Sequence, residues 1–136
     1  MADKNIYTVV VADDEDELRE AVCTMIPWEA LGFHLVGNAS NGLDALELVE
    51  RLEPDLLLTD IQMPGTNGFD LLRLLRQSHI GQSRSLPVAA MTARGDTDGE
   101  NYLKAGFAGY IRKPFSSPEL LAFLSSVTWR TGEPQE

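Results

Sequence analysis

Short apolar runs and helix-periodic stretches alternate along the chain. The first run, residues 7–12, is apolar and rich in valine, and residues 13–26 after it carry apolar side chains at helical spacing. The same succession of an apolar run and an amphipathic stretch then recurs to the end of the sequence. The predicted strands are 7–12, 33–39, 55–59, 86–92 and 109–113, and the predicted helices are 13–26, 41–53, 69–78, 96–106 and 117–127.

This order of strand followed by helix predicts an α/β domain with a parallel sheet and helices on both faces. The strands are apolar without alternation, which is typical of strands that are buried on both sides. Right-handed crossovers leave few ways to wind such a sheet. We therefore predict one domain over residues 1–129, a doubly wound sheet of five parallel strands, and a flexible tail over residues 130–136.

Composition excludes several classes of function. With 136 residues and 43% hydrophobic content, the chain can bury one ordinary core. A formal net charge of −10 argues against direct nucleic acid binding by this domain. No apolar run is long enough for membrane insertion, and residues 1–7 show no secretory signal. The single cysteine, Cys23, fits a reducing compartment, so we expect a cytoplasmic location.

Polar side chains stand at the carboxyl ends of four predicted strands: Asp13 and Asp14, Asp60, Thr92, and Lys113. These ends share one edge of a parallel sheet, where open α/β sheets bind ligands. Three carboxylates in one crevice raise each other's pKa values unless positive charge joins them. Lys113 supplies one positive charge, and Mg²⁺, which prefers oxygen ligands, is the natural second.

Such a site is equipped for phosphoryl transfer. A carboxylate nucleophile at Asp60 would become an aspartyl phosphate, while the cation and Lys113 neutralise charge on the moving group. The stretch "LLLTDIQMPGTNG" supports this interpretation, because a buried strand delivers Asp60 to a turn at Pro64-Gly65. Taken alone, Asp13 and Asp14 could equally serve as caps and dipole partners of the following helix. We expect Glu15 and Asp16 to stabilise the start of that helix, while Asp13 and Asp14 face the crevice.

Five segments, in order, resemble the receiver domain of two-component response regulators. They are "VVVADDEDELRE", "NGLDALELV", "PDLLLTDIQMPGTNGFDLL", "PVAAMTA" and "AGFAGYIRKPF", and together they cover nearly the whole chain. The resemblance implies a flavodoxin-like fold with strand order 2-1-3-4-5. It also implies that this signalling phosphoprotein is not an enzyme, beyond self-phosphorylation from small phosphodonors and autodephosphorylation.

By the same resemblance, Asp60 accepts the phosphoryl group from a sensor histidine kinase or a phosphotransfer domain. Asp60, Lys113 and Thr92 are then the catalytic candidates. Mg²⁺, or Mn²⁺, is bound by Asp14, Asp60 and the backbone carbonyl of Gln62, and Asp13 holds a metal-bound water.

The resemblance further implies that Thr92 and Tyr110 form a switch pair. Thr92 would move toward the phosphoryl group and Tyr110 would turn inward, which changes the face made by the fourth helix, the fifth strand and the fifth helix. An output domain, a partner or a homodimer is expected to use this face. Gly99 weakens the fourth helix by about 1 kcal/mol, which favours a movable element. The Lys113–Pro114 bond is expected to be cis.

Two other functions compete with this interpretation. A Mg²⁺-dependent phosphohydrolase of the haloacid dehalogenase type also forms an aspartyl phosphate, but it needs a second acid where this chain has Gln62. A flavin-binding module would carry a Ser/Thr/Gly-rich loop after the first strand, where this chain has "DDEDE".

Some features concern the surroundings of the site. "MIPWEALGFHLVG" resembles receivers attached to AraC-type DNA-binding domains, whereas "SLPVAAMTARGDTDGENYLKAGFAGYIRKPF" resembles receivers fused to hybrid sensor kinases. Gln62 and Arg94 occupy the positions two residues after Asp60 and two residues after Thr92. In this family, the residues at these positions influence the rate of dephosphorylation. The two histidines, His34 and His79, are expected to take no part in the site. The two tryptophans, Trp28 and Trp129, are expected to be packing residues.

Overall fold

The computed structural model describes residues 6–81, 83–93 and 99–126. Every predicted strand and helix is confirmed there, with small shifts at the ends. Arg94, Trp129, the tail 130–136 and the predicted helix ends at 96–98 and 127 lie outside the described residues. In chain order the elements are β1 Tyr7–Ala12, α1 Asp16–Met25, η1 Glu29–Leu31, β2 Phe33–Ala39, α2 Gly42–Leu52, β3 Leu56–Asp60, α3 Gly68–Gln77, η2 Ser83–Ser85, β4 Val88–Thr92, α4 Gly99–Ala105, β5 Gly109–Arg112 and α5 Ser117–Ser126.

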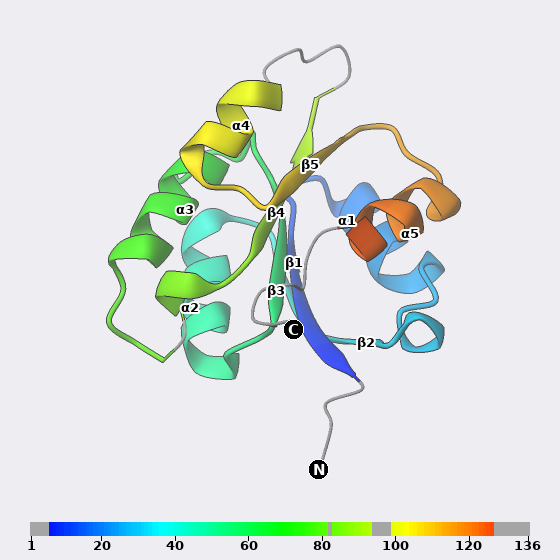
Figure 1. Cartoon of the computed structure of the whole chain (residues 1–136), viewed down its shortest axis with the longest axis horizontal. Helices are drawn as coiled ribbons and strands as arrows, with labels where there is room; N and C mark the ends of the chain where they lie inside the picture. Colours follow the sequence, from blue (N-terminus) through cyan, green and yellow to red (C-terminus); the bar gives the residue numbers. More distant parts are fainter. Residues whose placement is uncertain (1–5, 82, 94–98, 127–136) are drawn as a thin grey trace.

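The sheet has the expected topology. Its five strands lie in the order β2-β1-β3-β4-β5, and every neighbouring pair is parallel. The helices α2, α3 and α4 cover one face and α1 and α5 cover the other (Figure 1). The winding direction reverses between β1 and β3, so the crevice at their carboxyl ends is where this topology binds ligands. The flavodoxin-like prediction is confirmed.

Alternate residues of β1, β3 and β4 pack into two separate cores, one on each face of the sheet. This explains why these strands are mostly apolar. Val10 and Leu57 belong to the core under α2, α3 and α4. Val9, Val11 and Leu58 belong to the core under α1 and α5. All five side chains are fully buried. A strand with helices on both sides has no solvent-facing positions for polar residues, so the polar residues collect at the strand ends.

Local signals fix the elements next to the strand ends. Asn41 and Asn67 cap α2 and α3, and their side-chain oxygens accept hydrogen bonds from the backbone N–H three residues later. Gly65 has a φ of 79°, a left-handed conformation that glycine adopts without steric cost. The Lys113–Pro114 bond is cis, as expected. Within the described ranges, no helix is long and apolar enough to cross a membrane.

One side chain departs from the sequence pattern of α1. Met25 follows the helical spacing of the buried residues, yet it is 70% exposed. The helix ends at this residue, and the next residue, Ile26, packs with Val22 in the core under α1 and α5 instead. Trp28 is confirmed as a packing residue: it is buried, and its Nε1 donates a hydrogen bond to the Val22 carbonyl oxygen at 3.1 Å.

Candidate functional site

The fold brings the predicted polar residues to one edge of the sheet. Asp13 and Asp14 follow β1, Asp60 is the last residue of β3, Thr92 is the last residue of β4, and Lys113 follows β5. Parallel pairing sets Asp60 beside Met91, so Thr92 is the next residue along the neighbouring strand. This convergence follows directly from the parallel topology.

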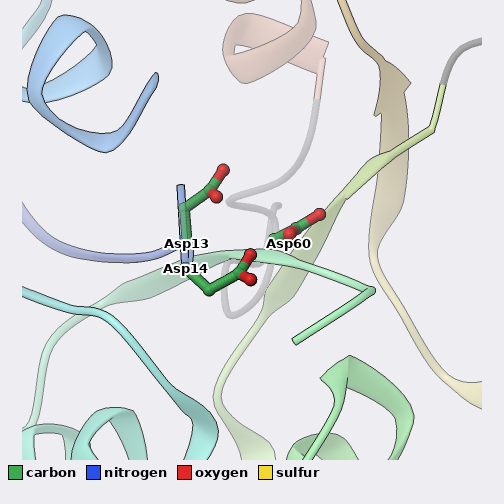
Figure 2. A group of neighbouring side chains, drawn as sticks. All are labelled: Asp13, Asp14 and Asp60. Atoms are coloured by element: carbon green, nitrogen blue, oxygen red, sulfur yellow. The ribbon is translucent and has the colours of Figure 1, made fainter. Parts of the chain in front are cut away.

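Three carboxylates form the centre of the site. Asp13, Asp14 and Asp60 each offer a carboxylate oxygen within 4.8 Å of the others. Figure 2 shows these carboxylates extending into the same space from the ends of β1 and β3. Asp13 and Asp60 are buried, while Asp14 is half-buried. The cluster therefore concentrates negative charge at a place that is largely shielded from water.

Lys113 partly balances this charge. Its Nζ atom lies 3.1 Å from Oδ1 of Asp60, 3.2 Å from Oδ2 of Asp13 and 3.4 Å from Oε1 of Glu15. The lysine side chain is only 16% exposed and both aspartates are buried, so its ion pairs with Asp13 and Asp60 are weakly screened by solvent. One ammonium nevertheless faces several carboxylates, and the site keeps an excess of negative charge.

The pKa values of Asp60, Asp13 and Lys113 reflect both their burial and the charges around them. Burial, followed by the charge of Asp13, raises the pKa of Asp60 to about 6, although Lys113 opposes the shift. Burial also raises the pKa of Asp13. Burial alone would lower the pKa of Lys113, but the two carboxylates outweigh it and hold the pKa above its ordinary value. Burial is thus the main cause of the raised pKa values of Asp13 and Asp60, and the charge of Asp13 adds to it at Asp60, while Lys113 stays charged.

The donor set fits a hard divalent cation. Three carboxylate oxygens at this spacing are the ligands that Mg²⁺ and Mn²⁺ prefer. Oδ2 of Asp13 is buried, and apart from its ion pair with Lys113 it accepts no hydrogen bond from any described residue. Asp14 and Gln62 line the same surface pocket, which also includes Asn67. The loop that carries Gln62 thus lies beside the acidic cluster.

Thr92 and Tyr110 have contrasting environments. Thr92 is fully buried, and its hydroxyl has no hydrogen-bond partner in the part of the chain that the structure describes. Tyr110 is half-buried and packs against Tyr102, with ring centroids 5.7 Å apart. Its ring also lies against Gly99, where an added Cβ would overlap the Tyr110 hydroxyl and lie 2.8 Å from Cε1.

Sequence reasoning misjudged or missed two residues near the site. Glu15 was expected to stabilise the start of α1, but its side chain makes no cap hydrogen bond and pairs with Lys113 instead. Arg19 was missed, although its Nη1 donates to the backbone carbonyl of Asp13 at 2.7 Å. The only local signal was its three-residue spacing from Asp16, with which it forms an ion pair.

The histidines lie away from the acidic cluster, as expected. His34 is the second residue of β2 and lies near the amino end of that strand, whereas the site is at the carboxyl ends. Its Nδ1 lies 2.7 Å from Oε2 of Glu29. His79 is exposed and follows the C-terminal end of α3. Neither contributes to the site at the carboxyl ends of the strands.

Comparisons with known proteins agree with the fold. The model of the response regulator receiver domain matches residues 9–125. The phosphate regulon transcriptional regulatory protein PhoB of Pseudomonas aeruginosa is 35% identical over 126 residues, which are 92% of this chain and 53% of PhoB. The chain therefore spans about half the length of this curated relative.

Solved structures are similar over nearly the whole chain. The REC domain of the response regulator AraT from Geobacillus stearothermophilus has a TM-score of 0.78 and 25% identity, covering 90% of this chain and 92% of that chain. The receiver domain of the sensor histidine kinase PA1611 from Pseudomonas aeruginosa, with a magnesium ion coordinated in its active site cleft, has a TM-score of 0.74 and 27% identity, covering 90% and 97%. The family match extends across all five strands, and on this evidence the chain belongs to the response regulator receiver domain family of two-component systems.

Proposed function

We propose that Asp60 accepts a phosphoryl group from a phosphohistidine on a sensor histidine kinase or a phosphotransfer domain. The observation that carries this proposal is the position of its carboxylate, which is buried at the end of β3, paired with Lys113 and surrounded by Asp13 and Asp14. A carboxylate oxygen of Asp60 forms the new bond to phosphorus, and the bond from phosphorus to the donor nitrogen breaks.

The charge state of Asp60 suits this role. With a pKa of about 6, the carboxyl is largely ionised near pH 7 and can act as a nucleophile. The Lys113 ammonium, 3.1 Å from Asp60, remains charged and can pair with the oxygens of the incoming group. Both groups are held in place before the donor arrives, which reduces the reorganisation needed during the reaction.

A divalent cation completes the charge balance in this proposal. Asp13, Asp14, Asp60 and the backbone carbonyl of Gln62 are the residues that would hold Mg²⁺ or Mn²⁺. The raised pKa of Asp60 and the three-carboxylate donor set support such a site, and the related receiver of PA1611 has magnesium in its cleft. When bound, the cation supplies positive charge that offsets the charge of the phosphoryl oxygens.

Thr92 and Tyr110 are the proposed switch residues. A phosphoryl group on Asp60 would bring acceptor oxygens close to the neighbouring strand, where the buried Thr92 hydroxyl lacks a partner among the described residues. A movement of Thr92 would alter the packing of Tyr110 on β5. The face made by α4, β5 and α5 is the proposed contact surface for an output domain, a partner or a second copy of the chain.

The relatives suggest the setting of this switch. PhoB is a transcriptional regulatory protein, and a DNA-binding output is one outcome that the α4–β5–α5 face could control. Autodephosphorylation at Asp60 and the cytoplasmic location expected from the sequence are also part of the proposal.

Incubation with acetyl phosphate and Mg²⁺ tests the central step. We expect one phosphoryl group per chain by intact-mass spectrometry, with complete loss in Asp60→Asn. Asp44→Asn removes one charge from an exposed aspartate of α2 and is expected to keep the modification. Retention of the label in Asp60→Asn would contradict the proposal, and many turnovers on a phosphoester would favour a phosphohydrolase of the haloacid dehalogenase type.

A further inference from the structure

Arg19 lies near the start of α1 and reaches back to the loop that carries the acidic pair. Its Nη1 donates a hydrogen bond to the backbone carbonyl oxygen of Asp13 at 2.7 Å, its Nε to Oδ1 of Asn38 at 3.1 Å, and its Nη2 to Oδ1 of Asp16 at 2.8 Å. The side chain is only 18% exposed. One guanidinium thus joins the loop after β1, the first turn of α1 and the end of β2.

The carbonyl that Arg19 binds belongs to the peptide unit between Asp13 and Asp14. Because a peptide unit is planar, a fixed carbonyl also fixes the direction in which the chain enters Asp14. The Asp13 N–H donates to the Ala39 carbonyl oxygen at 3.0 Å, so this residue is held on both sides. The Asp14 carboxylate differs, since no hydrogen bond or ion pair to it is found among the described residues.

We infer that Arg19 is a positioning residue for the divalent-cation site. It holds the Asp13–Asp14 peptide so that the Asp14 carboxylate lies beside those of Asp13 and Asp60 before a cation arrives. This inference deepens the proposed function and rests on it. A ligand that is already in place loses less conformational freedom on binding, which favours affinity.

Charge and positioning can be separated at this residue. A lysine keeps the positive charge near the carboxylates, but its single nitrogen cannot reproduce the fork that binds three acceptors in different directions. Arg73 offers a matched control on α3. Its Nη2 pairs with Oδ1 of Asp70 at 2.8 Å, the same distance and the same three-residue spacing as the pair of Arg19 with Asp16.

Calorimetric titration of the unphosphorylated full chain with Mg²⁺ tests the inference. Loss of a residue that orients a metal ligand typically costs 10- to 100-fold in affinity, so we expect Arg19→Lys to bind Mg²⁺ about tenfold more weakly and Arg73→Lys to match the wild type. Asn38→Ala keeps the bond to the Asp13 carbonyl and should lose less affinity than Arg19→Lys. It also provides a test if Arg19→Lys folds poorly.

A second readout needs no cation. In EDTA, the carbonyl ¹³C resonance of Asp13 should shift in Arg19→Lys and stay unchanged in Arg73→Lys, because only the first variant loses the hydrogen bond to this oxygen. Arg19→Lys that binds Mg²⁺ within about twofold of the wild type, well below the loss expected for an orienting residue, would overturn the inference. An equal loss in Arg73→Lys would also overturn it. A wild-type chain that binds no divalent cation would instead overturn the proposed function, and this inference with it.

Discussion

The two halves of the strand-end edge are built in different ways. At the ends of β1 and β3, charged side chains are joined by ion pairs and hydrogen bonds, with Lys113 bridging Asp13 and Asp60. The other half, made by β4 and β5 with α4, contains aromatic packing, although Lys113 reaches the acidic half from the end of β5. Tyr102 of α4 stacks on Phe69 with ring centroids 5.4 Å apart and also contacts Tyr110.

Two threonine hydroxyl groups, one on β3 and one on β4, also differ between the two halves. Thr59 of β3 is fully buried and donates a hydrogen bond to the Asp60 carbonyl oxygen at 3.0 Å. Thr92 of β4 is equally buried, but its hydroxyl has no partner within the described ranges. The acidic half is already organised to receive a charged group, whereas the aromatic half retains an unused donor. In the proposed function, a phosphoryl group on Asp60 would give the Thr92 hydroxyl an acceptor and so couple the two halves.

The largest expected effect concerns the acidic half and its dependence on pH. Folding raises the pKa of Asp60 from 3.8 to about 6, so the folded state holds this proton more tightly than the unfolded state. The stabilising contribution is complete below about pH 4 and is lost as the pH rises through about 6. Near pH 7, Asp60→Asn should therefore increase the free energy of unfolding by about 2–3 kcal/mol in cation-free buffer.

Urea unfolding in EDTA at pH 4.5 and pH 7 measures this effect. The stability difference between Asp60→Asn and wild type should be large at pH 7 and small at pH 4.5. Asp44→Asn, which also removes one negative charge but from an exposed position on α2, is the matched control. A constant difference at both pH values would mean that folding does not raise the pKa of Asp60.

The next effect concerns the contact between α4 and β5. Gly99 begins α4, and an added Cβ would overlap the Tyr110 hydroxyl. Gly99 was expected in the body of this helix, where alanine is more stable than glycine by about 0.5–1 kcal/mol, but it is the first residue of α4 and less of this gain applies. Overpacking costs about 1–3 kcal/mol. We expect Gly99→Ala to lower the free energy of unfolding by about 1–2 kcal/mol in the wild-type background.

A double-mutant cycle with Tyr110→Ala isolates this contact. Without the tyrosine ring, Gly99→Ala should become neutral or stabilising, which gives a coupling energy of about 2 kcal/mol from chemical denaturation. Additive effects of the two substitutions would show that Tyr110 does not occupy the space next to Gly99, and the distinction between the two halves would weaken.

The sequence contains more information about the acidic half than about the aromatic half. Continuous apolar strands predict a parallel sheet, and a parallel sheet places the strand ends on one edge, so the meeting of Asp13, Asp60 and Lys113 could be predicted. The α/β fold class was correct for the same reason, because it depends on periodicity and on the order of the elements, which local residue patterns encode. The strand order and the family were implied by the resemblance of five sequence segments to receiver domains, and not by periodicity.

Contacts between side chains on different elements could not be predicted in this way. The bond from Arg19 to the Asp13 carbonyl and the approach of Tyr110 to Gly99 depend on how each helix sits on the sheet. The exposure of Met25 has the same origin, since helical periodicity does not show which of the neighbours Met25 and Ile26 faces the core. Glu15 was assigned to the helix because acids commonly precede helices, but Lys113 from the end of β5 pairs with its side chain.

The smallest expected effect compares the two buried threonines directly. Burying a hydroxyl without a hydrogen bond is unfavourable, so Thr92→Val should raise the free energy of unfolding by about 0.5–1 kcal/mol. Thr59→Val removes a hydroxyl that is bonded to the Asp60 carbonyl and should lower it by a similar amount, about 0.5–1 kcal/mol. The opposite signs, measured by urea unfolding without Mg²⁺, would confirm that only the aromatic half has a free donor.

Beryllofluoride with Mg²⁺ should then stabilise the wild type more than Thr92→Val, because the valine cannot bond to the new acceptor at Asp60. Equal stabilisation of both proteins would show that the Thr92 hydroxyl plays no part in the response, and the coupling between the two halves would need another route.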